Sequence, residues 1–568
     1  KLMIKVKSKK NRGWRRLRNT LIGIAIVFAC FAMYYHFATR LSPPVIPDQS
    51  ALSWKRENPS PDFYRVGNNW LKKNNYGLWE MYLEGSPFEM GVANGKLTKE
   101  LIAQQEAAFV DQINTLIPSP AYLKFLKYFT GWFNRDIDEY IPEAYKEEIY
   151  GVSLSAADGY EYIGNKYDRM LNYHAAHDIG HALQSLMLVG CTSFGANFNS
   201  TDSSLIIGRN FDFFINPAFA ENKIVVFVHP DQGIDFMYVS WASMIGVVSG
   251  MNARGLTVTI NAAKSDIPTS AKTPISILAR EILQHAGNIK EALAVAEKRQ
   301  TFVAESLLIG SAEDNEAVII EKSPKRLGLF EVNDDLLVCA NHFQSDTFSL
   351  DENNELYKKE SATVYRQQRC EQLMQQAGFI DAPVAASILR DHLGLDGKNI
   401  GIGNEKTMAQ MISHHSVIFE PQKMIGWVST QPYQLGDYLG YHLDQVFAEG
   451  KAYQGNAPLY DSVLTIAFDS FLKSTEFADF LKFRDQREAV KQWIKNKTPK
   501  TEVKLQEFVS LNPEYYQGYV LTANYYYVMG DTARARQNYQ TALTKEMENT
   551  GTVEMIKARL EELKEKKN

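Results

Sequence analysis

The hydrophobic pattern changes several times along the chain. Residues 19–38 (NTLIGIAIVFACFAMYYHFA) contain no charge, and twenty such residues can span a bilayer as a helix. Across residues 70–190 apolar positions recur every three or four residues, which predicts helices. Across 191–458 short apolar runs alternate with turn residues, which predicts strands. From about 459 the helical spacing returns and continues to the end.

These patterns predict five segments. They are a basic N-terminus with a transmembrane anchor (1–40), a Pro- and Ser-rich linker (41–69), a helical segment (70–190), a strand-rich domain (191–458) and a helical region (459–568). Because the strands and helices come in blocks, the fold class we expect is α+β with antiparallel sheets.

The last segment contains a helix pair with small residues where the helices would meet. The spacing at 516–546 resembles one tetratricopeptide repeat. A single repeat cannot bury its own apolar face, so it would lean on the rest of the chain or bind a protein partner. A plain helical hairpin is the alternative interpretation.

Charge is distributed unevenly. Residues 1–18 contain nine Lys or Arg and no acid; without them, 52 of the 61 basic residues face 66 acidic ones, a net charge of −14. A body this acidic argues against nucleic-acid binding. The basic block predicts a cytoplasmic N-terminus and a non-cytoplasmic body. A cleaved signal peptide, or a lipoprotein signal ending at Cys30, fits the apolar segment less well.

No metal or cofactor is expected. The chain contains no CxxC pair, and therefore no sign of a zinc site or of a disulfide framework. His174, His177 and His181 share one predicted helix face and offer metal ligands, but no carboxylate or cysteine completes the set. We interpret them as packing residues.

The strongest chemical signal is Gly190-Cys191, followed by Arg209 and Asp212. Glycine allows strained backbone geometry, so the thiol could attack the carbonyl before it. Cleavage would make Cys191 a new N-terminus, whose α-amine, with a pKa near ~8, can act as a base. The alternatives are a cysteine buried for packing and a surface ion pair between Arg209 and Asp212.

Several blocks in order resemble the N-terminal-nucleophile (Ntn) acyltransferases and amidases. The blocks are GCTSF, IIGRNFDFF, VSGMNARGLTVTIN, VIIEKSP and VCANHF, within residues 79–438. The resemblance is greatest to isopenicillin N acyltransferase-type proteins, with acid ceramidase-type and bile-salt-hydrolase-type amidases further off. It implies a four-layer αββα sandwich and self-cleavage between Gly190 and Cys191.

The resemblance also implies roles for single residues. Cys191 would be the nucleophile, and Arg209 would lower its pKa. Asp212 would hold the new α-amine. The Asn341 side chain and the Asn261 backbone N–H would form the oxyanion hole.

A further motif, T-x-x-R-x-x-R, stands where this family tends to have S-x-x-R-x-x-R. Its residues Thr363, Arg366 and Arg369 would support the site, with Thr363 in place of the usual serine.

The strand carrying Arg209 and Asp212 faces a geometric demand. Side chains alternate along a regular strand, so these two would face opposite sides. Both can face Cys191 only if the strand bulges or turns near Asn210, a distortion that Gly208 would ease.

The sequence thus predicts a membrane-anchored, self-processing Ntn amidohydrolase or acyltransferase. Its substrate would be a small acyl amide or acyl thioester, and a Cys191 acyl-enzyme would pass its acyl group to water or to an amine. A membrane-tethered scaffold with a catalytically silent Ntn-like domain is the alternative.

Overall fold

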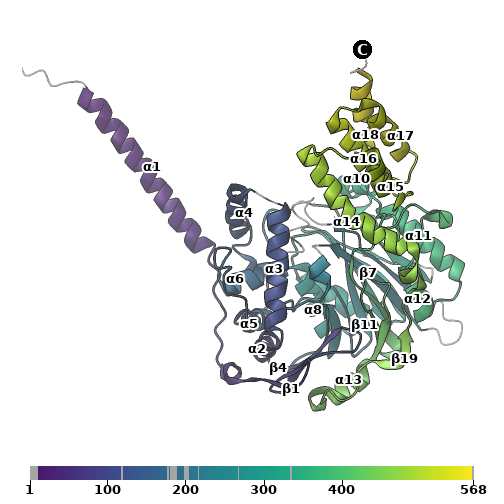
Figure 1. Ribbon diagram of the computed structural model, residues 1–568. Coiled ribbons are helices and arrows are strands. Elements are labelled where there is room, and N and C mark those ends of the chain that lie inside the picture. The colour runs from purple at the N-terminus through teal and green to yellow at the C-terminus, as the bar shows by residue number, and fades with distance from the viewer. Residues whose placement is uncertain are drawn as a thin grey trace, which may run out of the picture.

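The computed structural model describes residues 10–565, except 117–118, 176–177, 179–187, 198–203, 215–216, 267 and 333–334. Two sheets with helices packed around them form the body. A long N-terminal helix and a helical C-terminal lobe extend from the body (Figure 1).

The larger sheet has eleven strands within the described residues. All neighbours pair antiparallel except β4 and β8, which pair in parallel. In spatial order the strands are β1 (Arg56–Ser60), β2 (Phe63–Val66), β3 (Asn69–Lys73), β4 (Trp79–Gly85), β8 (Ile224–Pro230), β9 (Phe236–Ser240), β10 (Ser249–Asn252), β11 (Leu256–Ala262), β12 (Glu305–Ser311), β13 (Glu316–Lys322) and β14 (Leu327–Phe330).

The smaller sheet has eight strands in the described part of the chain, all antiparallel. In spatial order they are β15 (Leu336–Cys339), β6 (Thr192–Ala196), β7 (Ile206–Phe214), β16 (Ser413–Glu420), β17 (Ile425–Ser429), β18 (Tyr438–His442) and β19 (Asp461–Ile466). The eighth, β5 (Leu188–Val189), pairs with β7 off this path.

Apolar residues from both sheets share one core. Ile207 and Val417 of the smaller sheet cluster with Phe227, Met237 and Leu308 of the larger one. Each such buried side chain contributes about 1.5–3 kcal/mol. The mixed fold with antiparallel sheets is confirmed.

Helices fall into two groups by the core they share. Six share a core with the larger sheet: α2 (Pro87–Leu97), α3 (Lys99–Leu116), α5 (Glu143–Ser153), α6 (Lys166–His174), α8 (Ile275–His285) and α9 (Ile289–Lys298). Residues of α11 (Thr363–Ala377) and α12 (Ala382–Leu389) share a second core with the smaller sheet. The body also contains α4 (Pro120–Phe133), α10 (Glu352–Glu360) and α13 (Leu443–Glu449).

The structure corrects the pattern-based expectation for residues 56–85. This stretch, expected as linker and helix, forms β1–β4. Distant partners stabilise it: Arg65 donates from Nη1 to Tyr453 O at 2.7 Å, and Trp70 donates from Nε1 to Gly450 O at 3.0 Å. In the segment expected to be helical from 459, β19 extends the smaller sheet, and the long helices begin at Thr475.

Helices α2 and α5 approach closely because glycines lie at their contact. A Cβ added at Gly91 would lie 2.1 Å from Glu148 O, and one at Gly151 would lie 2.6 Å from Val92 N. No larger residue fits at either position without separating the helices.

A buried carboxylate on β4 reaches from the larger sheet to the smaller one. Glu80 Oε1 accepts from Asn74 Nδ2 at 2.7 Å and from the Tyr441 hydroxyl at 2.9 Å, whereas Oε2 has no partner among the described residues. Burial raises the pKa of Glu80 to about 7, although both hydrogen bonds oppose this.

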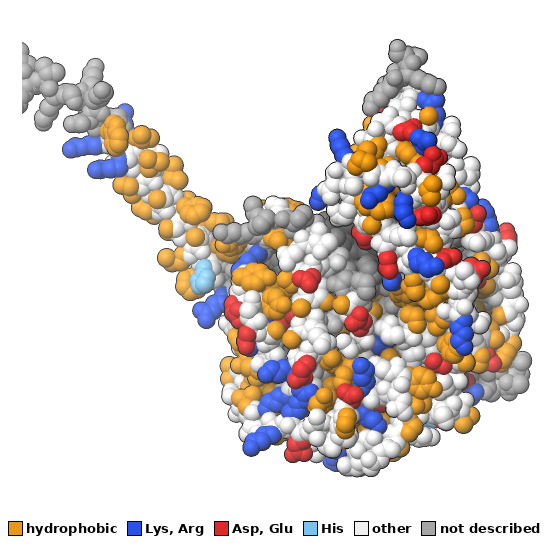
Figure 2. All heavy atoms as spheres, viewed as in Figure 1, with side chains coloured by type: hydrophobic (Ala, Val, Ile, Leu, Met, Phe, Trp, Pro, Cys, Tyr) orange, Lys and Arg blue, Asp and Glu red, His pale blue; other side chains and the backbone are white. Residues whose placement is uncertain are grey.

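The N-terminal helix α1 (Lys10–Ala38) carries apolar side chains that are exposed along its length (Figure 2). Its residues Trp14–Ala38 are long and apolar enough to be a membrane span or a signal sequence. Near its end the Tyr35 hydroxyl donates to Tyr128 O of α4 at 2.7 Å.

The C-terminal lobe consists of α14 (Thr475–Asn496), α15 (Glu502–Ser510), α16 (Tyr516–Met529), α17 (Thr532–Ala542) and α18 (Thr550–Glu565), which share one apolar core. Gly530, with φ +84°, makes the turn between α16 and α17. The helix pair is therefore present, and its assignment as a tetratricopeptide repeat stays a prediction.

Candidate active site

Gly190 and Cys191 lie beside β7, between two short strands. Strands β5 and β6 both pair with β7 in one continuous register, which places Gly190 opposite Asp212 and Cys191 opposite Phe211. The Gly190 N–H donates to Asp212 O at 3.0 Å.

The expected distortion of β7 near Asn210 is absent, because its pairing with β6 is regular through that residue. The register shift lies instead in β16, between Ser413 and His415. Side chains therefore alternate along β7. Opposed residues of paired strands share a face, so Arg209 lies on the same face as Cys191 and Asp212 on the other.

Arg209 contacts the thiol directly. Its Nη2 donates to Cys191 Sγ at 3.7 Å, and its Nη1 donates to Val248 O at 2.8 Å. Further hydrogen bonds to Ser249 Oγ and Ile260 O fix the fully buried guanidinium. The buried cation is thus held in place by neutral oxygens of β10, β11 and the residue before β10.

Burial of the Cys191 thiol raises its pKa and so favours the protonated form. Cys191 is 1% exposed, and burial raises its pKa to about 11. Arg209 opposes this rise, as expected from its charge, whereas Asp212 and Glu305 add to it. Its Sγ donates to Asp212 O at 3.8 Å.

The Asp212 carboxyl lies on the opposite face of β7 among polar groups. Oδ1 accepts from the Ser413 hydroxyl, and Oδ2 accepts from Gln410 Nε2 at 3.3 Å. Burial raises its pKa to about 7, although Ser413, Arg366 and Arg209 lower it. Both charge states of Asp212 are therefore accessible near neutral pH.

Gln410 also donates from Nε2 to Gly190 O, the carbonyl of the predicted scissile bond. A Cβ at Gly190 would lie 2.3 Å from Gln410 Oε1. Gly190 does not have a positive φ, so the expected backbone strain is absent, and what glycine provides here is room for the Gln410 amide. No sequence signal indicated Gln410, because it lies 220 positions from Gly190.

The two residues predicted to form the oxyanion hole, Asn341 and Asn261, lie near the site, but their N–H groups are directed at other backbone oxygens. Asn341 Nδ2 donates to Ala262 O at 3.0 Å. Asn261 pairs with Ser306 in the ladder, and the Ala263 N–H donates to O of Ala304, the residue before β12, at 2.9 Å. Hydrogen-bonded pairs alternate in an antiparallel ladder, so the Asn261 N–H also faces β12. Its role as an oxyanion donor stays a prediction that requires this bond to be shared or released.

Arg366 joins several parts of the site. Its Nε donates to Thr192 Oγ1 at 2.7 Å, its Nη2 donates to Cys191 O at 3.4 Å and to Asn341 Oδ1, and its Nη1 donates to Glu405 O at 2.7 Å.

Arg366 belongs to the T-x-x-R-x-x-R motif, whose other two residues, Thr363 and Arg369, have different surroundings. Thr363 Oγ1 accepts from the Asn341 N–H at 2.8 Å, which holds the backbone of Asn341 against the first residue of α11. Arg369 instead forms a bidentate ion pair with Asp391, with both bonds at 2.9 Å. The structure brings Thr363 to the site, whereas the partners of the Arg369 guanidinium are Asp391 and Gln372, which are not predicted site residues.

Loop 399–411 connects the site to the C-terminal lobe. Asn512 accepts from the Ile402 N–H at 3.1 Å and donates to Ile402 O at 2.8 Å. The Glu405 N–H donates to Glu548 Oε1 at 2.9 Å. The same loop carries Gln410, so the lobe holds a segment that contacts the Gly190 carbonyl.

The predicted histidine set is described only in part. His174 Nε2 accepts from the Ile245 N–H at 3.0 Å, and burial lowers the pKa of His174 to about 4. His177 and His181 lie outside the described residues. The described residues hold no group of three or more His, Cys, Asp or Glu side chains that could bind a metal.

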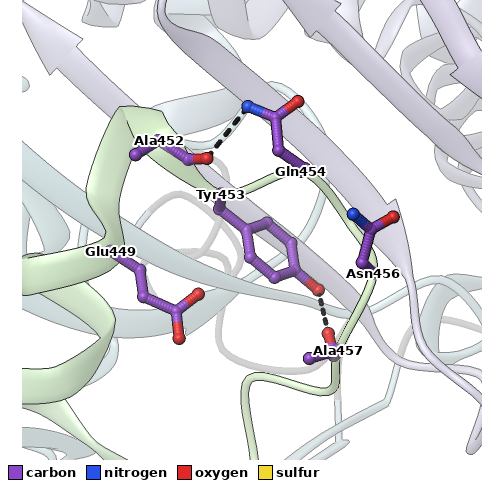
Figure 3. A pocket seen from close by; sticks show the side chains of 6 residues that line it. All are labelled: Glu449, Ala452, Tyr453, Gln454, Asn456 and Ala457. Atoms are coloured by element: carbon purple, nitrogen blue, oxygen red, sulfur yellow. Dashed lines mark hydrogen bonds between the residues drawn. The ribbon is translucent and has the colours of Figure 1, made fainter.

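A surface hollow lies away from these residues, at the end of α13 (Figure 3). In its lining the Tyr453 hydroxyl donates to Ala457 O and Gln454 Nε2 donates to Ala452 O. Glu449 and Asn456 complete the lining. It contains none of the predicted site residues.

Comparison with known proteins gives partial matches. The family model of acyl-coenzyme A:6-aminopenicillanic acid acyl-transferase matches residues 199–420. An uncharacterized protein of Archaeoglobus fulgidus is 26% identical over 312 residues, 47% of this chain and 50% of that protein. N-acylethanolamine-hydrolyzing acid amidase of Caenorhabditis elegans is 25% identical over 224 residues, 38% of this chain and 59% of that one.

Among solved structures, the Caenorhabditis elegans ortholog of this amidase aligns with a TM-score of 0.31 and 18% identity, over 41% of this chain and 93% of that chain. The chain spans about half the length of the first curated relatives it matches. The family-model match and the amidase relative support a relationship to the Ntn superfamily of acyltransferases and amide hydrolases.

Proposed function

We propose that this protein is a self-processing cysteine Ntn enzyme. It cleaves its own Gly190–Cys191 bond and then hydrolyses a linear acyl amide or thioester, or transfers its acyl group. The observation that carries this proposal is the buried Arg209 guanidinium, 3.7 Å from the sulfur of a cysteine that follows glycine. Cys339 and Cys370 are also buried, and their thiols contact Ala340 O and Met374 Sδ instead.

In the proposed reaction the freed α-amine of Cys191 takes the thiol proton as the sulfur attacks the substrate carbonyl. Asn341 and the Asn261 N–H hold the oxyanion, and Arg366 positions Asn341 through its Oδ1. Asp212 holds the new amine. Water or an acceptor amine then releases the acyl group.

The catalytic unit is proposed to be a four-layer αββα sandwich. The core between the sheets and the two helix-facing cores support this arrangement. We assign α1 as a membrane anchor, with the catalytic unit on the non-cytoplasmic side, because its apolar residues follow the basic block at 1–18. The C-terminal lobe is a proposed site for a protein partner.

The proposed substrate class rests on the acyl-transfer chemistry of a cysteine nucleophile and on the name of one relative. The Caenorhabditis elegans relative is named for hydrolysing N-acylethanolamines, so N-acyl amides are the first compounds to test, with and without amine acceptors. Acceptor-dependent product would identify a transferase, and product in water alone a hydrolase.

Mass spectrometry of the purified full chain tests the proposal. Two fragments meeting at Gly190/Cys191 are expected, together with labelling by a thiol-directed acyl probe. Cys191→Ala should abolish both. Labelling that persists in this variant would show that Cys191 is not the nucleophile. A parent chain that stays uncut and resists the probe would favour a scaffold.

A further inference from the structure

Both backbone polar groups of Gly190 are held, but by different partners. Opposed residues in a hydrogen-bonded antiparallel pair normally exchange two bonds. Here the Gly190 N–H donates to Asp212 O, whereas the Gly190 carbonyl turns out of the ladder and accepts from Gln410 Nε2. The peptide that would be cut is therefore withdrawn from the ladder at its carbonyl.

The orientation of the Gln410 amide is fixed by two acceptors. Its Nε2 lies within hydrogen-bonding distance of Gly190 O and 3.3 Å from Asp212 Oδ2, and Oε1 has no partner among the described residues. A primary amide offers two hydrogens on nitrogen, one for each acceptor. Asp212 thus keeps the donor side of the amide on the Gly190 carbonyl.

We propose that Gln410 is the oxyanion donor for self-cleavage, distinct from Asn341, which serves the substrate carbonyl. This inference rests on the proposed function. Asn341 directs its amide nitrogen to Ala262 O, while Gln410 alone among the described side chains donates to Gly190 O. The chain would therefore have one carbonyl-binding group for its own peptide and another for its substrate.

The step balances without any added cofactor. Cys191 Sγ bonds to the Gly190 carbonyl carbon, and the carbonyl oxygen becomes the oxyanion that Gln410 Nε2–H holds. The bond from that carbon to the Cys191 nitrogen then breaks, and the thiol proton ends on the departing amine. Water cleaves the resulting thioester, which gives a Gly190 carboxylate and restores the thiol.

The test follows fragment formation in the full chain by intact mass. Gln410→Met keeps the side-chain length and removes the donor, so cleavage should slow by about a hundredfold or more. Gln434→Met is the matched control, because Gln434 is also buried with an unpartnered Oε1 in the described chain. It should cleave at the parent rate.

Two further readouts separate catalysis from folding. In a Cys191→Ala background, Gln410→Met should lower the thermal unfolding midpoint by no more than the loss of two hydrogen bonds entails, and the yield of folded chain should match that of the background. In the chain that retains Cys191, acyl-probe labelling of Gln410→Met, counted per cleaved chain, should match the parent. Cleavage of Gln410→Met at the parent rate would overturn the inference alone, and so would a large loss of folded protein in the uncut background. A parent chain that is never cut would overturn the proposed function as well.

A double substitution gives a second test. A methyl added at Gly190 would displace the Gln410 amide, so Gly190→Ala should slow cleavage in the parent. In a Gln410→Ala background the same methyl has room and should add little. Fully additive effects would contradict the assigned contact.

Discussion

Asn512→Ala should release loop 399–411 from the C-terminal lobe. Asn512 satisfies both the N–H and the C=O of Ile402, at 3.1 and 2.8 Å, and both residues are buried. Alanine removes both partners and offers none in return. The N–H and C=O of Ile402 can then form hydrogen bonds to water only when the loop detaches.

The size of the effect follows from these two bonds. A buried donor or acceptor left without its partner costs about 1–3 kcal/mol; at the lower part of that range, losing the two partners of Ile402 favours the detached loop by about 2–3 kcal/mol. Since 1.4 kcal/mol corresponds to a factor of ten, the loop amides should exchange about 30- to 150-fold faster. Formation of the Gly190/Cys191 fragments should slow as well, because the loop carries Gln410.

Hydrogen exchange read by mass spectrometry on peptides covering 399–411 measures this opening. Asn538→Ala is the control, because the half-buried Asn538 side chain donates a solvent-exposed hydrogen bond to Arg534 O within its own helix α17. Loop exchange in Asn512→Ala within twofold of that control would refute the idea that Asn512 holds the loop. Faster exchange with unchanged fragment formation would refute the coupling to the site.

Two further predictions concern stability. Glu80 has a pKa of about 7 when folded against an ordinary 4.5, so the folded chain binds its proton more tightly and the stability from Glu80 is lost as pH rises from 4.5 through 7. Glu80→Gln should therefore raise the free energy of unfolding by about 3 kcal/mol at pH 8.5 and by little at pH 4 in urea titrations; an equal gain at both would contradict this. Gly91→Ala forces a methyl to 2.1 Å from Glu148 O and should cost about 1–3 kcal/mol, seen as a lower unfolding midpoint. Gly551→Ala is the control: its methyl would lie 3.7 Å from Asn549 Oδ1, an ordinary contact, so it should not lower the midpoint. A similar fall in both variants would argue against the steric cause.

Local pattern predicted the elements whose own residues determine them. The apolar runs around Arg209 and before Asn261 form β7 and β11, and the uncharged run at 19–38 lies within one exposed helix. Strands β1–β4 were missed because their stability comes from residues nearly 400 positions away, such as Gly450 on Trp70. Strand propensity is assessed from residues that are neighbours in the sequence, so it carries no information on such distant partners.

The same distinction applies to the site. Cys191, Arg209 and Asp212 lie within 22 positions and could be found from their spacing, and the alternation rule alone places the last two on opposite faces of β7. Gln410 could not be found, since only the fold brings loop 399–411 to Gly190.

The regular alternation of β7 suits the proposed self-cleavage better than the expected bulge. One face presents Arg209 to the sulfur that would attack, and the other presents Asp212 to the Gln410 amide, which donates to the Gly190 carbonyl. A bulge that turned both side chains toward the thiol would leave Gln410 without the acceptor that orients it. Attack on a carbonyl needs a nucleophile at the carbon and a hydrogen-bond donor at the oxygen, and in the proposed reaction a single undistorted strand supplies the residue that supports each.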